Sequence, residues 1–281
     1  MKTGVIDVGG GMRGVYAAGI FDSCIDQKVN FDYCIGISAG SANVVSYMAG
    51  QKGRNYPFYY DYSFRKEYMG FGHFLRTGSY INLEYIYGTL SNRGGENPLD
   101  FEKLMKNPGE LTIIASNAVT GEEKLFHQAD MAQDDYRILM ASSCVPVANR
   151  PVRIGDDWYF DGALANPVPI EKAFQDGCDR VVLILTKPVD LIRNPDKDAK
   201  LAKLLQHKYP MAAKNLSLRA ERYNRGVQKA LEYEKQGKVL ILSPADTFGV
   251  DTLKREKESL RRFYEEGVHD GEKISQWLAR A

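Results

Sequence analysis

The first fifty residues alternate twice between a short apolar run, a turn of small residues and a helical pattern. The first apolar run covers 3–8 (TGVIDV), three glycines follow at 9–11, and a helical pattern covers about 14–27. A second apolar run at 31–37 (FDYCIGI) leads through SAGS into a helical pattern at about 40–50. This alternation of strand, turn and helix is typical of α/β proteins, in which helices connect neighbouring strands of a mostly parallel sheet.

The rest of the chain continues the alternation and ends in long helical patterns. Apolar runs typical of strands lie at 111–119, 123–127, 157–160, 180–186 and 238–242, and helical patterns fill 198–235 and 251–280. The stretch at 191–198 looks like a connection, so we divide the chain into a core at 1–190 and a basic helical extension at 191–281. Because the run at 239–242 is apolar throughout, as a buried strand would be, we expect it to return to the core sheet.

Composition excludes several classes of protein. The chain has 281 residues, of which 44% are hydrophobic, and it carries 37 basic and 36 acidic side chains. These values exclude a disordered chain, and no stretch of about 18 residues is apolar enough to span a membrane. The net charge of +1 argues against a dedicated nucleic-acid binder. The start of the chain lacks the pattern of a secretory signal, so we expect a cytoplasmic protein.

The cysteines are scattered and form neither a CxxC pair nor a metal-ligand spacing with histidine. They are Cys24, Cys34, Cys144 and Cys178, and each has apolar neighbours. We therefore expect buried free thiols in a reducing compartment, and we expect neither a metal nor another cofactor.

Charge is uneven along the chain. Residues 1–190 carry a net charge of −5 and residues 191–281 carry +6, with 12 basic against 5 acidic side chains in 191–238. Two interpretations of this basic stretch remain open. It is either a solvated helical face or a surface that makes peripheral contact with the anionic headgroups of the inner membrane leaflet.

The strongest chemical signal is GISAGS at 36–41, which is a GxSxG pattern with Ser38 at its centre. A nucleophile on a sharp turn between a strand and a helix has a strained backbone, so its neighbours must be small. Gly36 and Gly40 leave room for such a turn. The N-terminus of the following helix also favours negative charge that develops at the site. The pattern therefore predicts that Ser38 is a catalytic nucleophile.

The second signal is GGGMRG at 9–14, between the first strand and its helix. Consecutive glycines expose backbone N–H groups, which can hold an oxyanion or a phosphate. The phosphate interpretation is the weaker one, because the chain has no GxxxxGK[ST] motif and no acidic residue that closes a second strand about 20 residues on. Arg13 either braces this loop or forms a structural ion pair.

The third signal is DGA at 161–163, directly after the strand-like run WYF. An acid followed by glycine at the end of a strand places a carboxylate on a turn, where it can act as a general base. Histidine is the usual base for a serine nucleophile, but none of the histidines lies in a small-residue turn after a strand. These are His73, His127, His207 and His269. We expect surface or cap roles for them and a carboxylate base.

Residues 54–90 form an insert that holds 12 of the 31 aromatic side chains. This segment is either a helical cap with an aromatic core or a cap that lines an acyl-chain pocket or rests on a membrane interface. Both interpretations place the insert over the core.

In order and context, GGGMRG, GISAGS and DGA resemble the patatin-like phospholipases. The resemblance covers about residues 4–187 and includes ASSCVP at 141–146 and NPVP at 166–169. The tail from about 219 looks like the C-terminal extension of a bacterial subgroup of that family. The resemblance implies a three-layer α/β/α sandwich and a serine acyl hydrolase with a Ser–Asp dyad.

The resemblance also implies roles for individual residues. Ser38 matches the nucleophile, Asp161 its dyad partner, Gly9, Gly10 and Gly11 the oxyanion loop, and Arg13 the basic residue after it. Asp161 is followed by Gly162 and Ala163 in place of two glycines, a variation that the family tolerates. The implied reaction is metal-independent hydrolysis of lipid acyl esters through an acyl-enzyme.

Two other functions are weighed against this one. The first is a lipid- or acyl-binding protein in which the serine is idle, and the second is a nucleotide-binding protein that uses the glycine loop. The motifs do not specify the head group, the acyl length, the positional preference or the oligomeric state.

Overall fold

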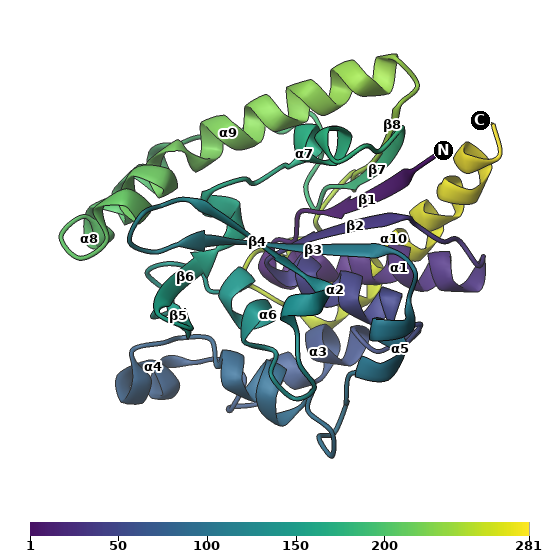
Figure 1. The fold of residues 1–281 in the computed structure, drawn as a ribbon. Helices are drawn as coiled ribbons and strands as arrows, with labels where there is room; N and C mark the ends of the chain where they lie inside the picture. Colours follow the sequence, from purple (N-terminus) through teal and green to yellow (C-terminus); the bar gives the residue numbers. More distant parts are fainter. Residues whose placement is uncertain (281) are drawn as a thin grey trace.

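A computed structural model describes residues 1–280 and contains a mixed sheet with the strand order β5-β6-β3-β2-β1-β7-β8 (Figure 1). Its neighbouring parallel strands are β3 (Glu110–Asn117), β2 (Tyr33–Ile37), β1 (Thr3–Asp7), β7 (Arg180–Ile184) and β8 (Val239–Leu242). Each begins within two residues of an apolar run in the sequence. The predicted α/β class with a mostly parallel sheet is therefore confirmed.

Antiparallel strands extend the sheet beyond β3. Both β4 (Glu123–His127) and β6 (Asp157–Asp161) pair with β3, and β5 (Val152–Ile154) pairs with β6. The sequence predicts β4 and β6 but not β5. The reason is that β5 has three residues and none of them is fully buried, so no apolar run marks it.

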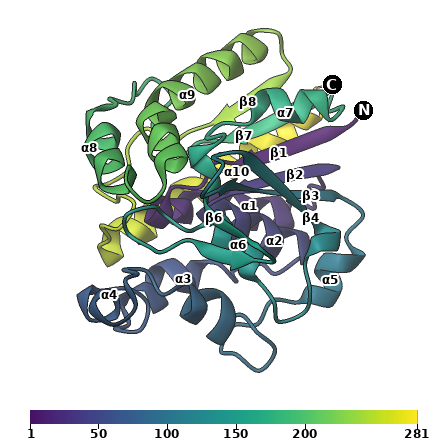
Figure 2. The same ribbon diagram turned by 60° about the vertical axis from the view of Figure 1, so that its left-hand side comes forward.

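Helices cover both faces of the parallel part of the sheet (Figures 1 and 2). One face carries α1 (Val15–Asp26), α2 (Ala39–Met48) and α10 (Lys257–Leu278), and the other carries α7 (Ile170–Gln175) and α9 (Pro210–Lys235). Successive side chains of a strand point to opposite faces. Accordingly, Val5 of β1 packs in the same core as α1 and α10, and Ile6 packs in the core that includes α7 and α9. The three-layer sandwich is confirmed.

Short helices occupy the insert at 54–90 and the connections. The insert contains α3 (Tyr56–Tyr60), η2 (Tyr62–Phe64), α4 (Phe71–Thr77) and η3 (Glu84–Thr89). The connections contain η1 (Gly11–Gly14), α5 (Phe101–Lys106), η4 (Gln128–Asp130), α6 (Arg137–Ser142), η5 (Gly162–Leu164) and α8 (Asp196–Leu205). Several aromatic side chains of the insert are buried in the core, whereas α4 has no buried residue.

The C-terminal segment takes part in the same core as the N-terminal segment. Strand β8 pairs with β7, and α10 packs against α1 at glycine contacts. A Cβ at Gly19 or Gly267 would collide with the backbone of the facing helix. The Tyr16 hydroxyl donates a hydrogen bond to Asp270 at 2.6 Å. Residues after 190 therefore contribute a strand to the sheet and a long helix to each of its two faces, and the boundary at 190 stays a prediction.

The carboxyl ends of β1, β2 and β7 lie next to one another, because these strands are parallel neighbours. The glycine loop follows β1, Ser38 follows β2 and Lys187 follows β7. Ligands of open α/β sheets bind at this edge of the sheet. All four cysteines are free and buried, as expected. Within residues 1–280, no helix is long and apolar enough to cross a bilayer.

Candidate active site

Ser38 lies on the turn between β2 and α2 with a backbone that few residues other than glycine adopt. Its φ is 56° and its ψ is −134°, and the residue is buried. Strained backbone of this kind costs of order 1–3 kcal/mol and persists only where the surroundings enforce it. A Cβ at Gly36 or Gly40 would meet the backbone of Ser41 or of Asp7. Small neighbours therefore allow the turn, as the GxSxG pattern predicts.

Hydrogen bonds hold the turn at Ser38 in place. Its backbone N–H donates to the Ser142 hydroxyl at 2.9 Å, and that hydroxyl donates to the Ile114 carbonyl at 2.7 Å. The Ser41 hydroxyl donates to the Ser38 carbonyl at 2.7 Å. Sequence analysis missed the role of Ser142, although it lies within the ASSCVP stretch. This serine connects the turn to β3 and limits its movement.

The glycine loop approaches Ser38 closely. Gly9, Gly10 and Gly11 have φ values of +65°, +140° and +62°, which strongly favour glycine. The Gly9 N–H donates to the Asp7 carboxylate at 2.8 Å, so this group is not free to stabilise an oxyanion. No hydrogen-bond partner is found within residues 1–280 for the N–H of Gly10 or of Gly11. The Gly9 N–H is thus engaged, whereas those of Gly10 and Gly11 are not, and the oxyanion role of the loop stays a prediction.

Asp7 is a buried carboxylate that sequence analysis missed. It accepts the Gly9 N–H at 2.8 Å and the Asn43 amide at 2.9 Å. Burial raises the pKa of Asp7 to about 6, and these two hydrogen bonds oppose the rise. The only signal in the sequence is an acid within the first apolar run. Asp7 positions the glycine loop relative to α2, since Asn43 belongs to that helix.

Asp161 ends β6 and faces the same cavity as Ser38. The residue is 5% exposed, and its carboxylate accepts the Ala163 N–H at 2.9 Å. Burial raises the pKa of Asp161, and its interactions with the Ser38 side chain and the Ala163 N–H lower it in part. Gly162 lets the turn pass close to β3, because a Cβ there would collide with the Ile114 carbonyl. The structure therefore brings Ser38, Asp161 and the glycine loop together.

No histidine between residues 1 and 280 lines either pocket at Ser38. His73 lies on α4, His207 lies in the turn before α9, and His269 is exposed on α10. The fourth, His127, takes part in a separate network described next. Their positions agree with the expectation of surface and cap roles.

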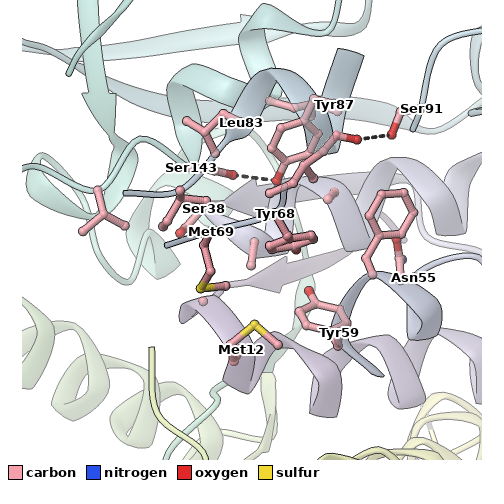
Figure 3. A pocket seen from close by; sticks show the side chains of 18 of the residues that line it. Met12, Ser38, Asn55, Tyr59, Tyr68, Met69, Leu83, Tyr87, Ser91 and Ser143 are labelled. Carbon is pink, nitrogen blue, oxygen red and sulfur yellow. Dashed lines mark hydrogen bonds between the residues drawn. The ribbon is translucent and has the colours of Figure 1, made fainter. Parts of the chain in front are cut away.

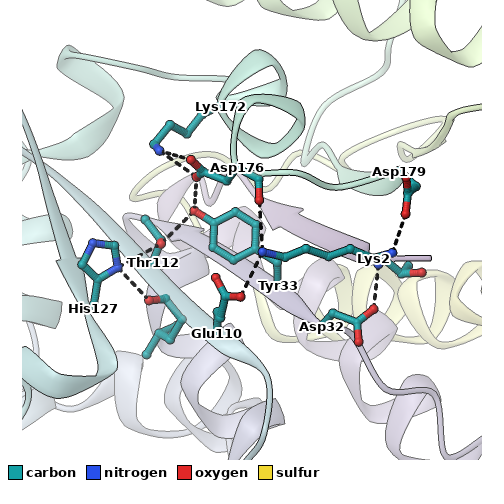
Figure 4. A network of polar contacts seen from close by, with 11 residues as sticks. Lys2, Asp32, Tyr33, Glu110, Thr112, His127, Lys172, Asp176 and Asp179 are labelled. Carbon is teal, nitrogen blue, oxygen red and sulfur yellow. Dashed lines mark hydrogen bonds and ion pairs between the residues drawn. The ribbon is translucent and has the colours of Figure 1, made fainter.

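Figure 4 shows a polar network at the opposite, amino-terminal edge of the sheet. Tyr33, the first residue of β2, donates its hydroxyl to Asp176 at 2.6 Å and lies 2.9 Å from the Thr112 hydroxyl. The Nδ1 atom of His127 lies 3.3 Å from the same Thr112 hydroxyl. At about 3.3 Å per residue, β2 separates this network from Ser38 by roughly 16 Å. His127 is therefore too far away to act on Ser38.

Arg13 connects the glycine loop to the C-terminal segment. Its guanidinium forms an ion pair with Asp251 and lies 3.4 Å from the Thr252 hydroxyl. The Met12 N–H donates to the Thr252 carbonyl at 3.1 Å. A Cβ at Gly11 would collide with that same carbonyl. Arg13 therefore forms the expected ion pair, and its role in bracing the loop stays a prediction.

A narrow apolar pocket opens beside Ser38 under the insert (Figure 3). Its wall includes Phe58, Tyr59, Tyr68 and Tyr87, which are also part of the core. The Tyr87 hydroxyl is hydrogen-bonded to Ser143 at 2.9 Å and the Tyr59 hydroxyl to Asn43 at 3.1 Å. Since these hydroxyl groups are satisfied within the protein, the wall is suited to an apolar chain. The two interpretations of the insert are therefore compatible.

A wide pocket opens on the other side of Ser38. The glycine loop, Asp161 and residues of the C-terminal segment line it. It encloses about 1940 Å³, open solvent included, against about 810 Å³ for the narrow pocket. The two pockets share Gly11, Ser38, Val145, Thr252 and Leu253. A molecule with a reacting group at Ser38 can therefore extend in both directions.

The family model described as patatin-like phospholipase matches residues 8–174, which is more than half of the chain. The chain therefore belongs to the patatin-like phospholipase family, as the three motifs indicate. A second family model, a domain of unknown function (DUF6363), matches residues 209–280 and fits the predicted C-terminal extension.

Two individual proteins are similar over most of the chain. The uncharacterised protein YjjU of Escherichia coli strain K12 is 25% identical over 248 residues, which cover 83% of this chain and 65% of YjjU. The crystal structure of VipD from Legionella pneumophila aligns with a TM-score of 0.47 and 12% identity, over 97% of this chain and 66% of VipD. The chain thus spans about two thirds of the length of each.

Proposed function

We propose that this protein is a serine acyl hydrolase that cleaves lipid esters with Ser38 as nucleophile and Asp161 as general base. The observation that supports this most directly is the convergence of three features on one cavity. These features are a serine on a strained turn, a buried carboxylate that lines the same cavity, and a glycine loop with N–H groups that have no partner within residues 1–280. Nucleophile, base and oxyanion donors are the parts that acyl transfer requires.

In the first step, Ser38 Oγ attacks the ester carbonyl carbon while the Asp161 carboxylate takes the hydroxyl proton, directly or through a water molecule. The carbonyl electron pair moves onto oxygen, and the N–H groups of Gly10 and Gly11 stabilise that oxyanion. One such donor contributes about 2.7–4 kcal/mol in serine hydrolases. Collapse of the intermediate expels the alcohol, which receives the proton. Water then cleaves the acyl-enzyme with Asp161 again as base.

The alternative is a lipid-binding protein in which the serine is idle. An apolar pocket alone would serve both functions, whereas the strained turn at Ser38 favours the enzyme. Covalent labelling by a fluorophosphonate distinguishes the two, because only an activated serine reacts. Labelled Ser38 supports the hydrolase, and an unlabelled, folded protein without turnover supports the binding protein.

Hydrolysis of p-nitrophenyl esters should become more efficient as the acyl chain lengthens from acetate to octanoate. Each buried CH₂ contributes up to about 0.8 kcal/mol, so kcat/KM should rise at least tenfold over this series if the narrow pocket holds the chain. The assay is run in EDTA, because the proposed mechanism uses no metal ion. A flat chain-length profile would exclude the narrow pocket as the acyl site, and activity that requires added calcium would contradict the mechanism.

We also propose a cytoplasmic protein in peripheral contact with an anionic membrane. Phe71 and Leu75 on α4 are 67% and 73% exposed, and Phe71 lines the mouth of the wide pocket. Exposed apolar side chains beside a lipid-binding cavity are suited to insertion at a membrane surface. Replacing both with serine should reduce cosedimentation with vesicles several-fold and leave hydrolysis of a water-soluble ester within about twofold. Unchanged cosedimentation would argue against α4 as the contact.

A further inference from the structure

The wide pocket beside Ser38 carries more positive than negative side chains. Its basic residues are Arg13, Lys187, Arg193, Lys197, Arg219 and Lys254. Its acidic residues are Asp161, Asp198 and Asp251. The lining therefore has a net formal charge of +3, six basic minus three acidic groups, in a chain of net charge +1. All of the basic residues except Arg13 lie beyond residue 174, where the match to the patatin-like family ends.

Two of the acidic residues already have structural partners. Asp198 accepts two hydrogen bonds from Arg219, at 2.6 and 3.0 Å, and lies 3.5 Å from Arg193. Asp251 forms the ion pair with Arg13. Asp198 thus neutralises one of its two guanidinium neighbours, and positive charge in excess faces the cavity.

Lys187 adds a cation that has no salt bridge within residues 1–280. Burial together with repulsion from Arg13, Arg193 and Arg219 lowers the pKa of Lys187 to about 8, and attraction to Asp251 opposes this. The buried Nε of Arg13 has no hydrogen-bond partner in the same part of the chain. Neighbouring, partly buried positive charges raise the free energy of the folded protein unless an anion binds between them.

We propose that the wide pocket binds the phosphate of an anionic lipid headgroup while the ester of the same lipid lies at Ser38. This inference rests on the proposed hydrolase function and adds a substrate class to it. The two pockets meet at Ser38 and Gly11, so the acyl chain lies in the narrow pocket and the headgroup in the wide one. Guanidinium groups bind phosphate oxygens through paired, charge-assisted hydrogen bonds.

The arrangement also selects against other headgroups. A zwitterionic headgroup would bring a positively charged ammonium group toward Lys187 and Arg193, whereas the carboxylates of Asp198 and Asp251 are already engaged. A neutral headgroup would leave the excess positive charge uncompensated. Repulsion of the wrong ligand contributes to specificity as much as attraction of the right one. The C-terminal segment therefore determines headgroup preference.

Binding is tested first without chemistry, by calorimetric titration of glycerol phosphate into the Ser38→Ala protein. Adding Lys187→Met should weaken binding roughly tenfold, the effect of one charge-assisted contact, and Lys187→Arg should restore it. Lys187 is chosen because loss of Arg193 or Arg219 would disturb a buried ion pair. The matched control is Lys203→Met, an exposed lysine of α8 outside the pocket, which should change nothing. Absent binding, or equal binding by Lys187→Met, overturns the proposal.

Hydrolysis then distinguishes a headgroup site from a site for free phosphate. The otherwise wild-type enzyme should prefer vesicles of phosphatidylglycerol to vesicles of phosphatidylcholine, and Lys187→Met should reduce this preference roughly tenfold. Binding of inorganic phosphate without any preference for the anionic lipid would assign the pocket to a free anion and overturn the headgroup proposal.

The two proposals fail in different ways. If all esters and the fluorophosphonate leave Ser38 untouched, the hydrolase proposal fails. If neutral esters are hydrolysed but glycerol phosphate does not bind, only the headgroup proposal fails.

Discussion

Replacing Ser38 with alanine should lower kcat for ester hydrolysis by roughly 10⁴-fold or more. The hydroxyl is the only group that forms the acyl bond in the proposed mechanism. After its loss, only substrate binding and the oxyanion donors remain to accelerate hydrolysis. Residual catalysis of that kind remains far below that of the intact machinery in other serine hydrolases. The measurement is steady-state hydrolysis of the best p-nitrophenyl ester, with fluorophosphonate labelling of both proteins.

The alanine variant should remain folded, since alanine and serine place the same Cβ on the strained backbone at φ 56°. The hydrogen bonds of the turn use the backbone of Ser38, and the substitution keeps them. A matched control is Ser217→Ala on α9, whose hydroxyl bonds only a helix carbonyl. This control should keep activity within about twofold. Full activity in the Ser38 variant would place the nucleophile elsewhere.

The sequence predicted those parts of the fold and site that depend on neighbouring residues. Apolar runs mark the strands of the parallel sheet, because strands that are buried on both faces have no polar alternation. The turn at Ser38 and the glycine loop were predictable for a similar reason. Their backbone conformations need small residues at fixed positions, and a local sequence pattern such as GxSxG shows those residues directly.

Other features arise only when distant segments meet. The bond of the Gly9 N–H to Asp7 depends on the path of the loop after β1, and the role of Ser142 depends on α6 lying beside the turn at Ser38. The short strand β5 carries no apolar run and is stabilised by pairing with β6. Periodicity cannot report such contacts.

The sequence also does not predict which basic side chains of the C-terminal segment face the cavity. From the sequence, Arg193, Lys203 and Arg219 are equivalent members of one basic stretch. In the structure, Lys203 is exposed, whereas Arg193 and Arg219 line the wide pocket around the buried carboxylate of Asp198. Whether a basic residue faces solvent or a cavity depends on how α8 and α9 pack, and composition does not carry that information.

Replacing Asp161 with asparagine should reduce kcat/KM roughly 10⁴-fold, comparable to loss of the triad aspartate in a serine protease. Asparagine keeps the shape and can still accept the Ala163 N–H, but it cannot take the proton of Ser38. The variant should unfold at a temperature equal to or above that of wild type at neutral pH, because burial raises the pKa of Asp161 and makes its ionised form costly. Asp157→Asn, at the exposed start of β6, is the matched control.

The dependence of rate on pH gives a further test of Asp161. The base must be ionised, so kcat/KM of the wild-type enzyme should fall as pH drops through the raised pKa of this carboxyl, above its ordinary 3.8. Burial raises the pKa of Asp7 to about 6, so this second buried carboxyl also titrates in the acidic range. The Asp7→Asn variant separates the contributions of the two groups to the pH profile. If Asp161 is the base, the acidic limb persists in Asp7→Asn and disappears from the residual activity of Asp161→Asn. If the limb follows Asp7, the acid dependence reflects the glycine loop and the assignment of Asp161 fails.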